Sequence, residues 1–364
     1  MAYKRTALFD IHQRMGARLI PFGGWEMPVE YSGISKEHTA VRNAAGLFDV
    51  SHMGEFEVTG SQALNLIQHV TSNDASLLVD GQVQYSALTT PEGTAVDDLL
   101  VYRHSRERFM LVVNAANIDS DLEWIRSNNS FDAKVLNCSG DTALLALQGP
   151  RAVDILRRLA DVDVRGIPSY HFLSGKVLDV TALVSRTGYT GEDGFELYFP
   201  ASESEKLWNG ILQSGEPDGL LPAGLGARNT LRLEAKLLLY GNDLDRSTSL
   251  LEAGLGWIVK LEKGPFIGSQ SLAKQKTEGL RRKLAGFVMS GKDIARDHYP
   301  VSVNGKEVGQ VTSGSPSITL KQNIGLTYLP VEHATPGTSI EVSVRGRACK
   351  AEVVRTPFYR RRAA

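Results

Sequence analysis

A loop with three regularly spaced glycines joins two strand-like runs in the middle of the chain. Residues 180–184, Val-Thr-Ala-Leu-Val, precede the loop, and residues 197–199, Leu-Tyr-Phe, follow it. Between the runs lie Gly188, Gly191 and Gly194, and glycine can take positive φ without the steric cost that other residues meet. The pattern predicts a hairpin-like turn whose backbone is open to a ligand.

One carboxylate interrupts the second run. Glu196 stands between Phe195 and Leu197, where an ionised group is costly unless it is paired or faces water. Two interpretations stay open: an exposed glutamate on the wet face of an edge strand, or a glutamate that binds a ligand. A ligand with two adjacent N–H donors, such as the edge of a pterin, would suit the second, because a carboxylate accepts two parallel hydrogen bonds.

A second pair of carboxylates lies in the clearest β-meander of the chain, residues 83–114. Three strand-like runs there are separated by the polar turns 90–93 and 104–107. Asp97 and Asp98 are neighbours on one run, so their side chains should point to opposite faces of the strand and not form a catalytic pair. Either could face a site, and both could equally be strand-edge carboxylates.

Helical patterns separate these strands. The longest predicted helix covers residues 223–239 and places Arg228, Arg232 and Lys236 on one face, which is either a salt-bridged surface or a clamp for a carboxylate tail. Five other helices are predicted. One covers residues 35–45, one begins at Ser61, and one begins at the Gly149-Pro150 step. The last two start at capping-box patterns, at Ser120/Glu123 and at Ser202/Glu205.

The last part of the chain differs in composition. After a polar segment, residues 263–283, short β runs and an Asn304-Gly305 turn predict a small all-β barrel or sandwich. Residues 281–364 hold 14 Lys and Arg against 6 Asp and Glu, a net +8, which leaves 26 against 35, a net −9, for residues 1–280. The basic end could steer an acidic partner, although a solvated surface gives the same pattern.

Composition and absent motifs narrow the function classes. A chain of 364 residues predicts two or three lobes, and no apolar run approaches the roughly 18 residues that span a bilayer. Cys138 and Cys349 are the only cysteines, and no histidine pair has metal-ligand spacing, so we expect a reducing, cytoplasmic setting and no metal. Neither a phosphate-binding P-loop nor a nucleophile elbow occurs, and residues 224–229 lack the third glycine of a dinucleotide fingerprint. Nucleic acid and membrane are not expected partners.

Taken in order, several stretches closely resemble the aminomethyltransferases, or T-proteins, of the glycine cleavage system. They cover nearly the full length: residues 23–28 (Gly-Gly-Trp-Glu-Met-Pro), 42–53, 85–101, 186–197, 224–235, 264–268 and 356–359. The resemblance implies an α+β fold in a three-lobed ring around tetrahydrofolate. Its lobes would be residues 1–52 with 140–262, residues 53–139 carrying Asp97, and the barrel of residues 284–364 after a linker at residues 263–283.

The resemblance also implies roles for individual residues. Glu196 would hold the pterin edge, and Asp97, rather than Asp98, would lie near N5 and N10 of the folate as the catalytic residue. The remaining folate contacts would come from Tyr85, Tyr189, Met53, Arg228, Trp257 and Tyr359.

The implied reaction uses the lipoylated H-protein as partner and tetrahydrofolate as co-substrate, and we expect the chain alone to be a monomer. Two related classes fit less well. A folate-binding regulator connected with iron–sulfur proteins or tRNA modification carries a cysteine in a Lys-Gly-Cys-Tyr stretch, where this chain has Lys263-Gly264-Pro265-Phe266. A dimethylglycine or sarcosine oxidase carries a flavin module, for which this chain has neither the length nor the motif.

Overall fold

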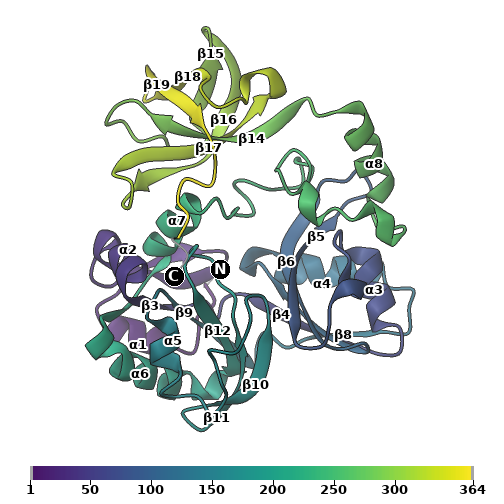
Figure 1. Cartoon of the computed structure of the whole chain (residues 1–364), viewed down its shortest axis with the longest axis vertical. Helices are drawn as coiled ribbons and strands as arrows, with labels where there is room; N and C mark the ends of the chain where they lie inside the picture. The colour runs from purple at the N-terminus through teal and green to yellow at the C-terminus, as the bar shows by residue number, and fades with distance from the viewer. Residues whose placement is uncertain (1–2, 362–364) are drawn as a thin grey trace. The chain divides into compact units, whose positions relative to one another are not determined.

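In the computed structural model, which describes residues 3–361, the predicted hairpin belongs to a six-stranded sheet (Figure 1). The strand order is β10-β11-β12-β9-β3-β13, and only β13 and β3 run parallel. The strands are β3 (Ala45–Asp49), β9 (Thr142–Gln148), β10 (Phe172–Val177), β11 (Val180–Ser185), β12 (Gly194–Pro200) and β13 (Leu220–Pro222).

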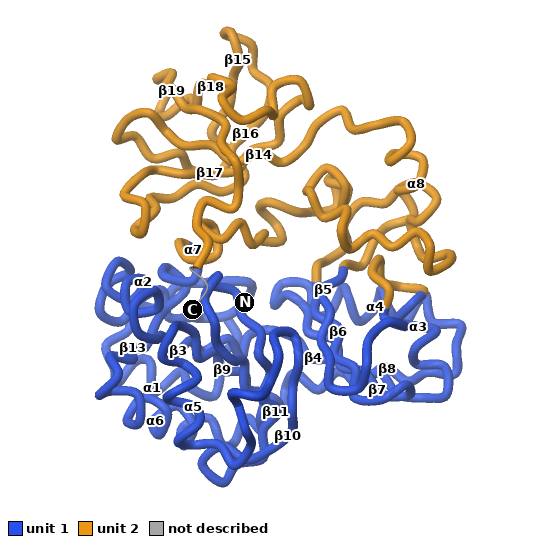
Figure 2. Tube along the Cα trace, in the orientation of Figure 1, with its two compact units in different colours: residues 1–68, 75–86, 99–229 blue, residues 69–74, 87–98, 230–364 orange. Residues whose placement is uncertain are grey.

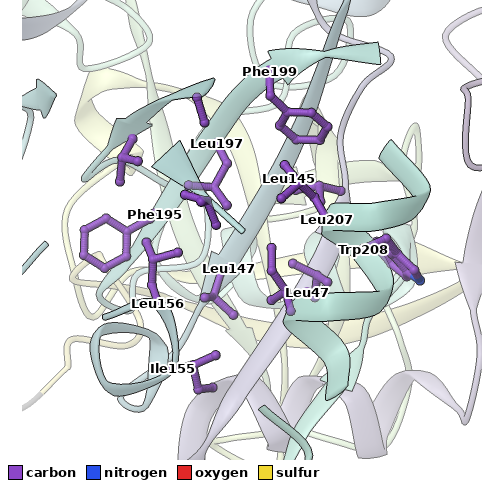
Figure 3. Close-up of a cluster of buried hydrophobic side chains, with 14 of the residues drawn as sticks. Leu47, Leu145, Leu147, Ile155, Leu156, Phe195, Leu197, Phe199, Leu207 and Trp208 are labelled. Atoms are coloured by element: carbon purple, nitrogen blue, oxygen red, sulfur yellow. The ribbon is translucent and has the colours of Figure 1, made fainter. Parts of the chain in front are cut away.

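The main core lies on one face of this sheet (Figure 3). Phe195, Leu197 and Phe199 alternate along β12 and pack in one buried cluster with side chains of α5 (Ala152–Leu156) and α6 (Ser204–Gly215). Because side chains alternate along a strand, Glu196 and Tyr198 point to the opposite face. β12 is an interior strand and Glu196 is buried, so the edge-strand interpretation of Glu196 is wrong.

The predicted meander is confirmed within a second sheet of order β5-β6-β7-β4-β8. Its strands are β4 (Gly54–Thr59), β5 (Gln82–Thr89), β6 (Ala95–Ser105), β7 (Arg108–Val113) and β8 (Lys134–Asn137). Helices α3 (Ala63–Val70) and α4 (Ile118–Ser127) lie between these strands in the chain.

The predicted C-terminal barrel is also confirmed, as a closed barrel of order β14-β17-β16-β15-β18-β19. Asn304 and Gly305 have φ of 51° and 77° and form the turn between β15 and β16, as the Asn-Gly pair predicted. The six strands are β14 (Arg282–Met289), β15 (Pro300–Val303), β16 (Lys306–Ser317), β17 (Gln322–Pro330), β18 (Ser339–Val344) and β19 (Arg347–Val354).

The remaining elements are short. They are α1 (Phe9–Arg14), the β1 (Arg18–Phe22) and β2 (Trp25–Glu30) hairpin, α2 (Ile34–Asn43), α7 (Leu225–Glu234) and α8 (Ser269–Glu278). Single 3-10 turns cover Ala75–Leu77, Ala115–Asn117, Ala201–Glu203, Glu216–Asp218, Gly256–Ile258, Leu261–Lys263 and Val331–His333. Helix α8 lies inside the segment predicted as a linker, so that segment is partly helical.

Several predicted helix ends are wrong. Helix α4 begins at Ile118, and Ser120 Oγ donates to the Asn117 carbonyl at 3.0 Å instead of capping the helix. Ser202 lies in a 3-10 turn before α6, and α5 begins two residues after Pro150. Helix α2 ends at Asn43, before the predicted end at residue 45, because Ala45 already pairs with Leu220 in the sheet.

Helix α7 is shorter than predicted, because a Schellman motif ends it. The Leu237 N–H donates to the Arg232 carbonyl at 2.9 Å, and the Lys236 N–H donates to the Leu233 carbonyl at 3.0 Å. Lys236 has a φ of 54°, in the left-handed region. Lys236 therefore does not share a helical face with Arg228 and Arg232.

The chain divides into two compact units (Figure 2). The first contains residues up to 68, 75–86 and 99–229, and the second contains residues 69–74, 87–98 and those from 230 onwards. The three-lobed ring and its lobe boundaries stay predictions of the family resemblance.

Candidate functional site

The glycine-spaced loop between β11 and β12 is held from three sides. Arg186 closes it with two hydrogen bonds to Asp193, from Nε to Oδ1 at 3.0 Å and from Nη2 to Oδ2 at 2.6 Å. Gln148 Nε2 donates to the Thr187 carbonyl at 3.0 Å, and Gln148 Oε1 accepts from Thr190 Oγ1 at 2.9 Å. Arg42 Nη1 donates to the Thr190 carbonyl at 2.8 Å. The loop therefore has a fixed backbone.

The three glycines of the loop serve two different purposes. Gly191 alone among them has a positive φ, of 80°. A Cβ at Gly188 would collide with the side-chain amide of Gln148, and a Cβ at Gly194 would lie 2.5 Å from the Leu147 carbonyl oxygen. Two of the glycines are thus required by close packing, and backbone freedom explains only the third.

Glu196 is buried, with 7% of its surface exposed, and its carboxylate is anchored on one side. Thr187 Oγ1 donates to Glu196 Oε2 at 2.5 Å. Burial raises the pKa of Glu196 above its ordinary value, while the Thr187 hydrogen bond and the charge of Arg228 act in the opposite direction. Within residues 3–361, Oε1 of Glu196 accepts no hydrogen bond, so this oxygen is available to a ligand.

Arg228, in the first turn of α7, connects Glu196 with the loop. Its guanidinium carbon lies 4.4 Å from the centroid of the Tyr189 ring, in the range of a cation–π contact. Burial, the larger cause, and the charge of Arg228 together lower the pKa of His52 to about 4. The charge of Asp49 acts in the opposite direction. The structure therefore gathers Glu196, Tyr189 and Arg228 at one site in the first unit.

Two further predicted folate contacts belong to the same unit. Met53 follows the buried His52 directly, and Tyr85 lies in β5; both side chains are half-buried.

The other predicted residues belong to the second unit. Asp97 on β6 is fully buried, and its neighbour Asp98 is half-buried. Trp257 lies in a 3-10 turn with 59% of its surface exposed, and the half-buried Tyr359 donates its N–H to the Glu234 carbonyl at 2.8 Å. A single site that combines these residues with Glu196 stays a prediction.

The predicted surface face of α7 is wrong at Arg232. This side chain is buried and pairs with Asp243, with Nη1 2.5 Å from Oδ2, while Nη2 donates to Ser313 Oγ at 2.8 Å. Arg232 is therefore part of the internal packing of the second unit.

Thr187, Ser185 and Gln148 were not predicted as site residues. Ser185 and Thr187 are two positions apart at the end of β11, which is the spacing of side chains on one face of a strand. That hydroxyl pair, followed by a carboxylate in the next apolar run, was the available signal. Nothing local indicates Gln148, which precedes the loop by almost forty residues.

The described chain shows neither a metal-binding group of side chains nor a membrane-spanning helix. Across residues 3–361, no three His, Cys, Asp or Glu side chains come together as a metal-binding group. In the same residues, no helix has the length and apolarity needed to cross a membrane.

Comparison with known proteins settles the family. Residues 8–263 match the GCVT N-terminal domain, and residues 282–360 match the glycine cleavage T-protein C-terminal barrel domain. The chain belongs to the glycine cleavage T-protein family. It is an aminomethyltransferase, as the sequence resemblance predicted.

Relatives of this family match along the whole chain. An aminomethyltransferase from Desulfitobacterium hafniense is 52% identical over 359 residues, which cover 98% of both chains. One from Symbiobacterium thermophilum is 51% identical over 377 aligned residues, covering 98% of this chain and 97% of the relative. The crystal structure of aminomethyltransferase T from Bartonella henselae superposes with a TM-score of 0.93 at 33% identity, covering 98% of each chain.

Proposed function

We propose that this T-protein family member transfers the one-carbon unit of an aminomethylated lipoyl arm, carried by an H-protein, to tetrahydrofolate. The C–S and C–N bonds of the S–CH2–NH3+ group break, and the methylene carbon forms bonds to N5 and N10 of the folate. The two N–H protons of the folate are taken up by the departing ammonia and the lipoyl sulfur. The products are 5,10-methylenetetrahydrofolate, ammonium and the dihydrolipoyl protein.

The anchored carboxylate of Glu196 is the observation that carries this proposal. One of its oxygens is held by Thr187, and the other accepts no hydrogen bond from residues 3–361. A pterin presents a 2-amino group beside N3–H, and two charge-assisted hydrogen bonds to a carboxylate would fix its orientation. The Tyr189 ring, stacked with the Arg228 guanidinium whose charge acts on Glu196, would offer the ligand a flat surface. Met53, Tyr85, Trp257 and Tyr359 would supply further contacts.

Asp97 is the proposed catalytic residue. A buried carboxylate interacts strongly with a developing cation, because little water screens the two charges. Asp97 would orient N5 and N10 and either accept a proton or stabilise the cationic iminium as the ring closes. The remaining rate enhancement would come from holding two substrates in line, without a metal ion or a covalent enzyme intermediate.

Charge supports the choice of protein partner. The net +8 of residues 281–364 would attract an acidic H-protein. We also propose that the chain is a monomer on its own and acts in the cytoplasm.

The decisive experiment uses aminomethyl-loaded H-protein with and without tetrahydrofolate, and measures both ammonia and methylenetetrahydrofolate. We expect ammonia release that depends on folate. The Asp97→Asn variant should retain folate binding and lose most of its turnover, by roughly two orders of magnitude or more, as removal of a group that assists in the transition state does. Folate-independent ammonia release in the unsubstituted protein would exclude the transferase proposal, and unchanged turnover of Asp97→Asn would exclude that role for Asp97.

A further inference from the structure

A cluster of four hydroxyl groups lies behind Glu196 in the first unit. Ser185 Oγ is 2.9 Å from Thr187 Oγ1, Tyr102 OH is 3.1 Å from Ser185 Oγ, and Tyr198 OH is 2.9 Å from Tyr102 OH. All four residues are buried, and β6, β11 with its following loop, and β12 supply them. Tyr198 lies on the face of β12 opposite to Phe195 and Leu197, so the hydroxyl cluster is separate from the apolar cluster on the other face of this sheet.

Proton counting gives this cluster a direction. A carboxylate can only accept, so the single hydroxyl proton of Thr187 is used on Glu196. Thr187 Oγ1 must then accept from Ser185, and Tyr102 OH lies 3.3 Å away as a second donor. Ser185 accepts from Tyr102, and Tyr102 must accept from Tyr198. The hydrogen bonds therefore run in one sense, from Tyr198 to Glu196, and such chains strengthen each bond along them.

We propose that Thr187, oriented by Ser185, Tyr102 and Tyr198, is a positioning residue that holds Glu196 ionised with Oε1 turned to the ligand. This inference rests on the proposed folate-binding role of Glu196. It adds that the carboxylate is preorganised: the conformational entropy of orienting it is lost when the chain folds and not when the ligand binds. It also adds that the ionised form of Glu196 depends on a hydroxyl donor as well as on a cation.

The charged and titratable groups around Glu196 set the sign of the pH effect. Arg228 and the Thr187 hydrogen bond favour the carboxylate, and burial opposes it. Burial mainly, and the charge of Glu196 in part, raises the pKa of the phenols of Tyr102, Tyr170 and Tyr198, so these groups keep their protons near neutral pH. Loss of the Thr187 donor should therefore raise the pKa of Glu196. As pH is lowered, the variant should then lose folate affinity at a higher pH than the unsubstituted protein does.

The test compares Thr187→Val with Thr187→Ser. Valine keeps the shape of threonine and removes the donor, whereas serine keeps the donor. Tetrahydrofolate affinity is measured from pH 5 to pH 8.5 by anaerobic fluorescence titration. For Thr187→Val we expect about tenfold weaker binding at neutral pH, as for loss of one hydrogen bond to a charged group. We also expect the acid limb, which is the fall in folate affinity on acidification, to shift to higher pH. Thr187→Ser should restore both towards the unsubstituted protein.

Further variants separate this inference from the function on which it rests. Glu196→Gln should weaken folate binding, and adding Thr187→Val to it should cause little further loss, because the two side chains act as one unit. If Glu196→Gln binds folate normally, the proposed role of Glu196 fails. If Glu196→Gln binds weakly while Thr187→Val shows an unshifted acid limb, the role of Glu196 stands and the positioning inference is overturned.

Ser185→Ala provides a second route if Thr187→Val does not fold. It leaves the Thr187 hydroxyl in place and removes its nearer donor, while Tyr102 OH remains 3.3 Å away. The acid limb should therefore shift in the same direction by a smaller amount. Thermal unfolding of every variant shows whether it folds. An acid limb identical to that of the unsubstituted protein in a folded Ser185→Ala variant would count against the directed chain.

Discussion

At the scale of single residues, Arg228 influences two buried groups that titrate in opposite ways. Its charge favours the ionised form of Glu196 and disfavours the protonated form of His52. One guanidinium thus favours the charged form of a carboxylate and the neutral form of an imidazole. The Tyr189 ring holds the guanidinium in place, which couples this effect to the glycine-spaced loop.

Replacing Arg228 with methionine should therefore raise two pKa values together. Without the cation, the pKa of His52 should rise from about 4, and the pKa of Glu196 should rise as well. Proton NMR of the His52 ring measures the first, and the acid limb of folate binding measures the second. Arg228→Lys keeps the charge and should leave both near their starting values. A His52 pKa that does not change in Arg228→Met would contradict this account.

Glu196 shows what local sequence could and could not reveal. The sequence predicted the hairpin, which is confirmed, and proposed Glu196 as a pterin ligand, which stays a prediction. It left open whether the side chain faced water, because the position of β12 inside the sheet depends on β9, whose residues lie far away in the chain. The support from Gln148 and Tyr102 could not be predicted for the same reason, since both contacts are non-local.

At the scale of elements, the end of α7 illustrates a second limit. Helical spacing extends to Lys236 and beyond, yet the helix ends at Glu234 in a Schellman motif. The usual signal for that motif is a glycine at the left-handed position, and here a lysine occupies it. Periodicity predicts which residues can form a helix, but it does not predict where local Schellman hydrogen bonds end it when no glycine marks the position.

The left-handed position makes a stability prediction. Lys236→Gly should be more stable than Lys236→Ala by about 1 kcal/mol, because alanine meets the same Cβ clash as lysine and glycine does not. Comparing the two variants cancels the loss of the lysine charge near Asp243. The measurement is the free energy of unfolding in denaturant. An alanine variant as stable as the glycine variant would show that backbone strain at residue 236 is negligible.

At the scale of the whole molecule, one buried acid should make stability depend on pH. Glu55 on β4 is 2% exposed, and neither of its carboxylate oxygens has a hydrogen-bond partner in the described chain. Burial raises its pKa well above the ordinary value of 4.5. The folded state thus holds this proton more tightly than the unfolded chain. The stabilising effect of that proton is complete below about pH 4.5 and is lost as pH rises towards the folded pKa.

Glu55→Gln removes this dependence, because an amide carries no charge at any of these pH values. Relative to the unsubstituted protein, the variant should gain about 1 kcal/mol or more between pH 5 and pH 8, since one unit of pKa shift corresponds to about 1.4 kcal/mol. Denaturant unfolding at three pH values measures the gain. Glu107→Gln, at an exposed turn position, is the matched control. A constant difference for Glu55→Gln would mean that Glu55 is ionised in the fold.

The order of strands in the first sheet has a consequence for synthesis. β3 ends at Asp49, its partner β9 begins at Thr142, and its other partner β13 ends at Pro222. A nascent chain emerges from its N-terminus, so β3 waits for both neighbours while its edges are unpaired, and such distant pairings form slowly. The N-terminal half therefore leaves the ribosome as an unfinished sheet, and premature termination before residue 222 should yield aggregating fragments rather than a stable partial protein.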